Sequence, residues 1–447
     1  VDLAKAHLCA LERAEKVTGI EYFNIGTGTG YSVLNYDLPE SDYTIQSTSY
    51  IGMDNLTTIK IGDNVTAIPA KAFENLKTIK EVIMSDSVKT IGSSAFEDCS
   101  GLESIKMSEN ITDIGSSAFC GCSKLTEITL PECLRSIDAY AFYDCSKLTV
   151  MTLPKGLTYL GSTALPEEVT TLYYNAENLT FSIYNDTSPL CHLSLTNIIF
   201  SDTIKRIPDG MFSGMKTLES LTLPDSITEI GEKAFYKSSF KSIKLPSKLI
   251  VIEDYAFSYA DVRFEGDALP NGTRMIGDYA FDHCTGFEEI YIPDSVVDIA
   301  EYAFYGCVDL IKVRMSSNVK LIASSAFAYC PILKDFIWDA DVKLIADYAF
   351  YNCKALKDFN FAGVELVYPN SFTNSGVTLV TLGHDKNDEA TDLIMVETQS
   401  FMGCENLDTV AIGGNVTTIK SEAFASCSSL ETAVISDSVI NIATNAF

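Results

Sequence analysis

The chain has 447 residues, of which 47% are hydrophobic, so it has ample material for a buried core. Its formal net charge is −28, which argues against nucleic acids and anionic lipid surfaces as partners, because proteins bind both through lysine and arginine. The same charge favours a soluble monomer. No apolar run of about 18 residues occurs, so the sequence predicts no membrane-spanning helix.

Residues 1–34 differ from the rest of the chain. Residues 1–12 have the pattern of a helix, 21–25 that of a buried strand, and 26–34 are glycine-rich. This stretch resembles an internal piece of UDP-glucose 4-epimerase. However, Gly26, Gly28 and Gly30 do not have the spacing of a dinucleotide-binding fingerprint, and the tyrosine–lysine catalytic pair of that family has no counterpart here. The segment is either a junction artefact or an N-terminal cap on the first coil of a repeat, with residues 35–54 as a linker.

From residue 55 to residue 447 the sequence repeats, with a step of about 23 residues. An Ala-Phe pair marks most copies, and its phenylalanine is expected in the core. These core phenylalanines are Phe96, Phe119, Phe142, Phe235, Phe281, Phe304, Phe327, Phe350 and Phe424.

Each repeat has two apolar edges. The pattern L-x-x-I-x-L, as in Leu125, Ile128 and Leu130, places apolar side chains on one face of a short strand. A proline often ends that strand, and a V-x-x-I-G segment follows, in which glycine suits a tight bend. One such coil cannot bury its own core, whereas stacked coils can.

These residues are similar to the BspA-like leucine-rich repeat family, of the form I-G-x-x-A-F-x-x-C-x-x-L-x-x-I-x-L-P. The resemblance implies a leucine-rich repeat solenoid, a right-handed β-rich superhelix of about 23-residue coils with a parallel sheet on one face. It also implies a bacterial or protist surface protein, often an adhesin. We expect Val1 and Phe447 to be internal points of a longer chain, so the compartment is inferred from the family and not from the termini.

Nine of the thirteen cysteines lie three residues after the core phenylalanine, where other copies have Leu76, Met215, Ser238 or Ala260. A position that accepts these residues is a small buried hydrophobic site, which predicts a ladder of free, buried thiols. Disulfides between neighbouring coils and a metal site are the alternatives. The ladder consists of Cys99, Cys122, Cys145, Cys284, Cys307, Cys330, Cys353, Cys404 and Cys427.

The repeat is irregular in two places. Residues 166–211 contain a copy that is hardly recognisable, and an insertion lies at 384–396. Insertions in solenoids emerge as loops that often carry binding, although neutral drift explains them equally well.

No catalytic motif stands out. His283 precedes Cys284, but Cys284 occupies the buried ladder position, so we interpret the pair as structural. The sequence therefore predicts no enzyme, no cofactor and no metal site.

Binding in solenoids commonly uses a face to which each coil contributes one outward side chain. The outward residue of each predicted strand is basic, aromatic, β-branched or otherwise uncharged, while the flanking positions carry acids such as Glu103, Glu288 and Asp335. Ordinary strand chemistry accounts for this column, since exposed strands favour such residues. The functional interpretation is a basic groove centred on Lys244, Arg263, Tyr291 and Arg314, with Lys106 and Asn360 as further members.

The sequence thus predicts a cell-surface or secreted protein that binds host or microbial surface proteins, extracellular matrix or glycans. The alternatives are a passive stalk that displays another domain and a remnant of a sugar-nucleotide epimerase fusion.

Overall fold

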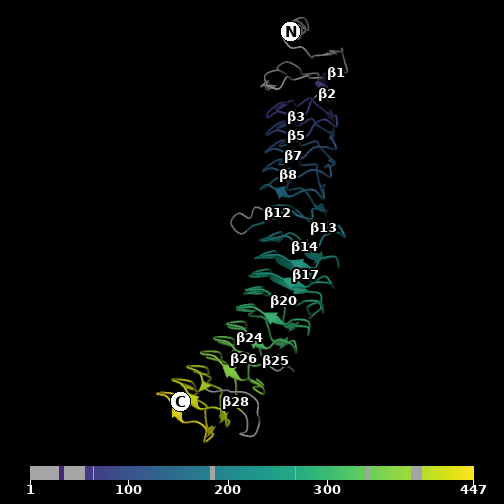
Figure 1. The fold of residues 1–447 in the computed structure, drawn as a ribbon. Helices are drawn as coiled ribbons and strands as arrows, with labels where there is room; N and C mark the ends of the chain where they lie inside the picture. Colours follow the sequence, from purple (N-terminus) through teal and green to yellow (C-terminus); the bar gives the residue numbers. More distant parts are fainter. Residues whose placement is uncertain are drawn as a thin grey trace. The chain divides into compact units, whose positions relative to one another are not determined.

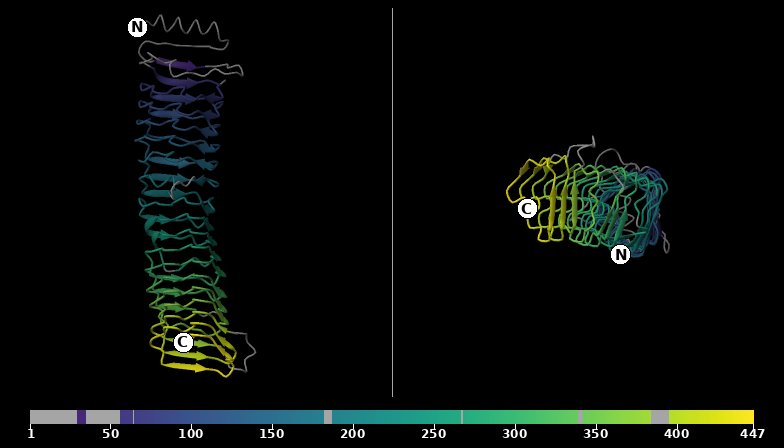
Figure 2. Two further views of the ribbon diagram at one scale, coloured as in Figure 1. Left: turned by 90° about the vertical axis from the view of Figure 1, so that its left-hand side faces the viewer. Right: turned by 90° about the horizontal axis from the view of Figure 1, so that it is seen from below.

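The computed structural model describes residues 30–34, 56–63, 65–181, 187–266, 268–338, 342–383 and 395–447. The chain divides into two compact units, unit 1 (Val1–Ile204) and unit 2 (Lys205–Phe447). In each unit the chain winds in coils of short strands and turns that stack on one another (Figure 1, Figure 2), and the described residues contain no helix. The predicted leucine-rich repeat solenoid is confirmed.

Each coil of unit 1 contributes up to two strands, which pair in parallel with those of the next coil. The longer strands form two sheets, β1-β2-β4-β6 and β9-β11-β13; their bounds are β1 Gly30–Leu34, β2 Leu56–Ile61, β4 Glu81–Met84, β6 Ser104–Lys106, β9 Val150–Leu153, β11 Thr171–Tyr174 and β13 Asn197–Phe200. The two-residue strands form one sheet; they are β3 Ala67–Ile68, β5 Thr90–Ile91, β7 Asp113–Ile114, β8 Ser136–Ile137, β10 Tyr159–Leu160 and β12 Thr180–Phe181.

Unit 2 has the same plan. Its longer strands form three sheets, β15-β17-β19, β21-β23-β25 and β28-β30-β32; they are β15 Ser220–Thr222, β17 Ser239–Lys244, β19 Asp261–Phe264, β21 Glu289–Tyr291, β23 Lys312–Arg314, β25 Asp335–Ile337, β28 Leu379–Leu382, β30 Thr409–Ile412 and β32 Thr432–Ile435. The two-residue strands are β14 Arg206–Ile207, β16 Glu229–Ile230, β18 Val251–Ile252, β20 Met275–Ile276, β22 Asp298–Ile299, β24 Leu321–Ile322, β26 Leu344–Ile345, β27 Leu366–Val367, β29 Met395–Val396, β31 Thr418–Ile419 and β33 Asn441–Ile442.

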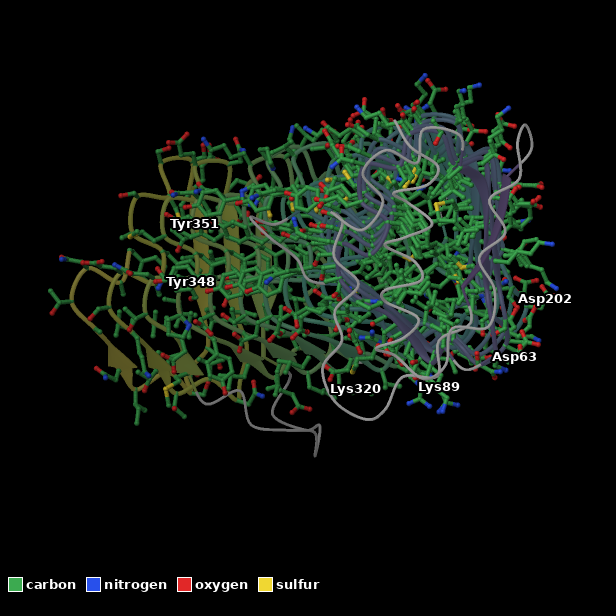
Figure 3. All side chains as sticks on the ribbon, turned by 90° about the horizontal axis from the view of Figure 1, so that it is seen from above. Asp63, Lys89, Asp202, Lys320, Tyr348 and Tyr351 are labelled. Carbon is green, nitrogen blue, oxygen red and sulfur yellow. The ribbon has the colours of Figure 1, made fainter. Side chains whose placement is uncertain are left out.

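The anchor phenylalanines form the core of each unit. None of those predicted from the sequence exposes more than 1% of its surface. Their rings stack from coil to coil, as between Phe96 and Phe119, whose centroids lie 5.2 Å apart with an interplanar angle of 3°. Viewed end-on, side chains fill the interior of the coils (Figure 3). The phenylalanine spacing therefore identified the core correctly.

Eight of the nine cysteines of the predicted thiol ladder are buried, and Cys427 is half-buried. The twelve described cysteines are free, and Cys99, Cys122, Cys145, Cys307 and Cys330 are among the buried ones. Their sulfur atoms have a polar role that the sequence did not show. The Cys99 thiol donates to the carbonyl oxygen of Phe73 at 3.1 Å, 26 residues earlier, and Cys307, Cys330 and Cys353 repeat this contact at 3.0–3.2 Å. Each of these four thiols thus links its coil to the coil before.

The predicted bend does not explain why glycine occupies the last position of the V-x-x-I-G segment. A Cβ at Gly92 would lie 2.5 Å from the backbone nitrogen of Ala70, and one at Gly115 would lie 2.7 Å from that of Ser93. Neither glycine has a left-handed φ. Glycine is needed there because the backbone of the preceding coil approaches too closely for a side chain.

The hardly recognisable copy within 166–211 forms coils like the others. Strand β11 pairs with β9 on one side and β13 on the other, so that Leu172 lies between Met151 and Ile198. Tyr174 takes the position of the second apolar residue and is fully buried. Its hydroxyl has no hydrogen-bond partner among the residues that the structure describes, and burial raises the pKa of this phenol.

Two sequence predictions fall partly or wholly outside the described residues. Of the epimerase-like segment 1–34, only residues 30–34 are described, and they pair in parallel with β2. Residues 384–394 of the predicted insertion and the predicted linker at 35–54 lie outside the described residues.

Candidate functional site

The outward side chains of the longer strands form a row on each sheet, which we term the sheet column. In strand β25, Asp335 and Ile337 are exposed and Phe336 is buried, so alternate side chains point away from the core. Strand β25 belongs to the sheet β21-β23-β25. On successive coils of this sheet, Arg314 lies opposite Tyr291 on one side and Ile337 on the other. Thr222 and Lys244 form the corresponding pair on β15 and β17.

In unit 1 the sheet column includes the predicted residue Lys106. It lies opposite Ile83, which lies opposite Lys60. The sequence interpretation omitted the coils around 166–211, and the structure adds Thr152, Tyr173 and Ile199 to the column there. Buried and exposed residues alternate along Thr171–Tyr174, as expected for a strand with one face in the core. The matching alternation in the sequence could have identified this strand, but the repeat was hard to recognise because its Ala-Phe pair is missing.

Tyr291 and Arg314 form the best-defined contact of the sheet column. The Arg314 guanidinium carbon lies 5.0 Å from the centroid of the Tyr291 ring, which is cation–π distance. The Arg314 side chain is exposed and Tyr291 is half-buried. A stacked guanidinium has less freedom to lose on binding, and its remaining donors stay available to a partner.

The predicted alignment of Arg263 with this column is wrong. Ile243 pairs with Phe264, whereas Phe240 pairs with Val262, so Lys241 and Ser242 form a bulge opposite Arg263. On the other side, the residue opposite Tyr291 is Ala268. Arg263 is exposed, but it lies at the interruption between β19 and β21, outside the row formed by Tyr291 and Arg314.

This interruption opens a surface depression of about 680 Å³. Buried apolar residues form part of its lining, namely Leu269, Phe287 and Ile290. Charged side chains, namely Arg263, Glu288 and Asp309, are exposed around it. An apolar floor with charged groups at the rim is typical of a site that binds an amphipathic group, such as a side chain or a sugar.

Asn360 lies at a second interruption, between β25 and β28, where a depression of about 450 Å³ is lined by residues that include Ile337, Trp338 and Asn360. The Asn360 side-chain oxygen accepts a hydrogen bond from the backbone nitrogen of Ala362 at 3.0 Å. Asn360 is exposed, as predicted. However, it lies in an irregular segment at the place where other coils have a longer strand.

The charges around the sheet column are more mixed than the sequence predicted. Lys312 lies opposite the flanking acid Glu289 and pairs with it at 2.9 Å. Hydrogen bonds from Ser317 and the positive charge of Arg314 lower the pKa of Asp294, which lies beyond the end of β21. The column thus has local ion pairs at its edges.

The pair His283 and Cys284 has no arrangement for nucleophilic chemistry. The Nδ1 atom of His283 lies 2.6 Å from Oδ1 of Asp282, and Ser258 donates to the other carboxylate oxygen at 3.1 Å. Burial raises the pKa of the Cys284 thiol, so the thiol is protonated at neutral pH.

Among the described residues, no group of histidine, cysteine or carboxylate side chains has the geometry to hold a metal ion. The same residues include no helix of sufficient length and apolar character to span a bilayer.

Comparison with known proteins agrees with the repeat. A family model for the BspA type leucine-rich repeat region matches residues 32–175, 182–265, 252–378 and 387–447. No match was found among curated proteins.

Several solved structures are similar to the chain. A leucine-rich repeat protein from Bacteroides ovatus is 22% identical, with 96% of this chain and 90% of that chain covered and a TM-score of 0.46. A leucine rich cell surface protein from Faecalibacterium prausnitzii is also 22% identical, with 93% and 92% covered and a TM-score of 0.28. The pneumococcal vaccine antigen PcpA is 17% identical, with 88% and 79% covered and a TM-score of 0.27.

Proposed function

Because the chain belongs to the BspA type leucine-rich repeat family, we propose that it is a cell-surface or secreted binding protein. Its partner is a host or microbial surface protein, an extracellular matrix protein or a glycan. The similarity to a cell surface protein from Faecalibacterium prausnitzii is consistent with this location.

The observation that carries the proposal is the position of Tyr291 and Arg314 beside the depression of about 680 Å³. Ala268, which lines the depression, lies opposite Tyr291, so the aromatic–guanidinium pair borders it. Tyrosine and arginine are the residue types that contribute most to binding energy at interfaces, especially next to a pocket that a partner can fill. Arg263 also lines the depression and can bind the same partner.

The test is binding of the full chain to immobilised matrix proteins and glycans, measured by surface plasmon resonance. The variant combines Lys244→Ala, Arg263→Ala, Tyr291→Ala and Arg314→Ala. The matched control removes three cations and one tyrosine elsewhere in unit 2 through Lys248→Ala, Arg274→Ala, Lys320→Ala and Tyr368→Ala, all exposed residues.

We expect saturable binding to at least one partner, weakened at least about 100-fold by the four combined substitutions, because each truncated hot-spot residue costs about 1–2 kcal/mol. The control should bind within about threefold of the unmodified chain, since rim charges contribute little. Equal loss in both variants would refute the location of the site. Absence of binding across the panel would favour the passive stalk.

A further inference from the structure

Unit 2 carries a second row of residues, which is distinct from the sheet column and lies in the turn that precedes each core phenylalanine. The row occupies the position two residues before that phenylalanine. In successive coils it holds Lys233, Tyr255, Tyr279, Tyr302, Ser325 and Tyr348, and we term it the turn row. The rings of Tyr255 and Tyr279 stack at 4.8 Å, and those of Tyr279 and Tyr302 at 4.5 Å.

The turn itself does not require tyrosine. The backbone at this position is left-handed, with φ of 56° at Tyr255, 55° at Tyr279 and 57° at Tyr302. A bulky residue is uncommon in this conformation. In unit 1 the same position holds Lys71, Ser94, Ser117, Tyr140 and Thr163, so small residues fold there as well as large ones. Tyrosines held in an unfavourable conformation, where serine also folds, indicate a role beyond the turn.

At the N-terminal end of the turn row, a tyrosine ring contacts a cation of the chain itself. Lys233 places its ammonium nitrogen 5.4 Å from the centroid of the Tyr255 ring. The same nitrogen lies 3.4 Å from a carboxylate oxygen of Glu232, the residue before it. A cation thus covers the outer face of the first tyrosine and is held by the ring together with a neighbouring carboxylate.

At the other end of the stack, the coil after that of Tyr302 has Ser325 at the turn-row position. Serine provides neither an aromatic ring nor a charge. Tyr348 occupies the next coil. At the ring spacing of this row, two coils separate Tyr302 and Tyr348 by roughly 9–10 Å. A cation midway would lie roughly 5 Å from each ring, which is within cation–π distance of about 6 Å.

Further tyrosines continue around Ser325. Tyr302 lies 5.6 Å from Tyr305, and Tyr348 lies 5.6 Å from Tyr351 (Figure 3 shows the latter pair). Tyr329 joins the two ends, at 5.2 Å from Tyr305 and 5.3 Å from Tyr351. These five residues form an arc of rings around Ser325, which we term the tyrosine arc.

Burial and charge both favour a cation at the tyrosine arc. Ser325 is only 4% exposed, so its side chain is shielded from water, whereas Tyr329 and Tyr348 are more than 40% exposed. Two carboxylates, Glu301 and Asp347, directly precede Tyr302 and Tyr348, as Glu232 precedes Lys233. The arc therefore combines tyrosine rings with carboxylate residues next to them in the sequence, as at Lys233, but contains no cationic residue of its own.

We propose that the tyrosine arc binds an organic ammonium group from outside the chain, seated over Ser325 between Tyr302 and Tyr348. The group is either a free quaternary ammonium ion or the end of a lysine side chain of a partner protein. The site shares no residue with the sheet column, so it is tested independently of the proposed function.

The experiment is proton NMR of tetramethylammonium and, separately, of a short peptide with one lysine, each titrated with the full chain. Protons held against aromatic faces move upfield, so we expect an upfield shift and broadening of the bound methyl or ε-methylene signal. A shift of tetramethylammonium alone supports a free cation, a shift of the peptide supports a protein partner, and both together support the shared chemistry. The absence of any shift would overturn the proposal.

Variants make the test specific. Ser325→Lys retains all tyrosines and should weaken binding at least about tenfold, because its own ammonium would occupy the arc as Lys233 occupies the face of Tyr255. Tyr302→Ser should have a similar effect, and it should fold because serine already occupies this position at Ser94 and Ser117. The control Tyr140→Ser changes an exposed tyrosine of the same turn in unit 1 and should bind normally.

The neutral probe 3,3-dimethyl-1-butanol, which has the shape of a quaternary ammonium without its charge, should show no shift. An equal shift of this alcohol, or unchanged binding by Ser325→Lys, would show that the rings offer only an apolar surface and would refute a cation site.

Discussion

Replacement of Phe304 by alanine should remove a large part of the stability of unit 2. Phe304 is fully buried, and its ring stacks on Phe281 at 5.0 Å and on Phe327 at 5.2 Å. Burial of the side chain is worth about 1.5–3 kcal/mol and each ring pair about 0.5–1.5 kcal/mol. The expected loss is therefore about 3–5 kcal/mol, as for other buried phenylalanines replaced by alanine.

The assay is urea denaturation followed by far-ultraviolet circular dichroism. The matched control is Phe447→Ala, since Phe447 stacks on Phe424 at 5.2 Å but is 45% exposed. It should cost less than about 1.5 kcal/mol, because Phe447 stacks on one ring among the described residues and its removal leaves no enclosed cavity. If both substitutions lowered the free energy of unfolding equally, the stacked core would not be the main source of stability and the reasoning would fail.

Three further outcomes are expected. Tyr174→Phe should raise the free energy of unfolding by about 1 kcal/mol in the same assay, because it removes a buried hydroxyl without a partner; a loss of stability would contradict this. Burial raises the pKa of Cys99 to about 12, so at pH 8 iodoacetamide should modify the exposed Cys133 and leave Cys99 intact, as read by mass spectrometry. Equal modification of both would disprove the buried thiol. Gly92→Ala should cost about 1–3 kcal/mol, because its Cβ would collide with the backbone of Ala70; an unchanged urea midpoint would show that the coils can move apart.

The core was predictable because its residues recur at a fixed interval. A buried position that must stack on its own copy in the next coil accepts few side chains, as Phe281 and Phe304 illustrate. The copy around Tyr174 was hardly recognisable because tyrosine replaces leucine there and no Ala-Phe pair marks the coil.

The candidate sites were less predictable, because they depend on departures from the repeat. The bulge at Lys241 and Ser242 moves Arg263 out of register, and nothing in the local pattern of β17 indicates the extra residues. The depression lies at the interruption between β19 and β21. The turn row was visible in principle, since an acid followed by Tyr-Ala-Phe recurs at Tyr279, Tyr302 and Tyr348. Its significance depends on rings from different coils lying side by side, which only the structure provides.

The thiol contacts of the ladder have a consequence for how such a chain can change in length. The Cys330 thiol bonds to the backbone carbonyl of Phe304, and the Cys353 thiol bonds in the same way to Phe327. Because the acceptor is a main-chain atom that every coil possesses, a coil does not need one particular neighbour. A genetic duplication or deletion of one whole period would therefore join ends that already match, so related genes can gain or lose coils by unequal recombination without new compensating substitutions.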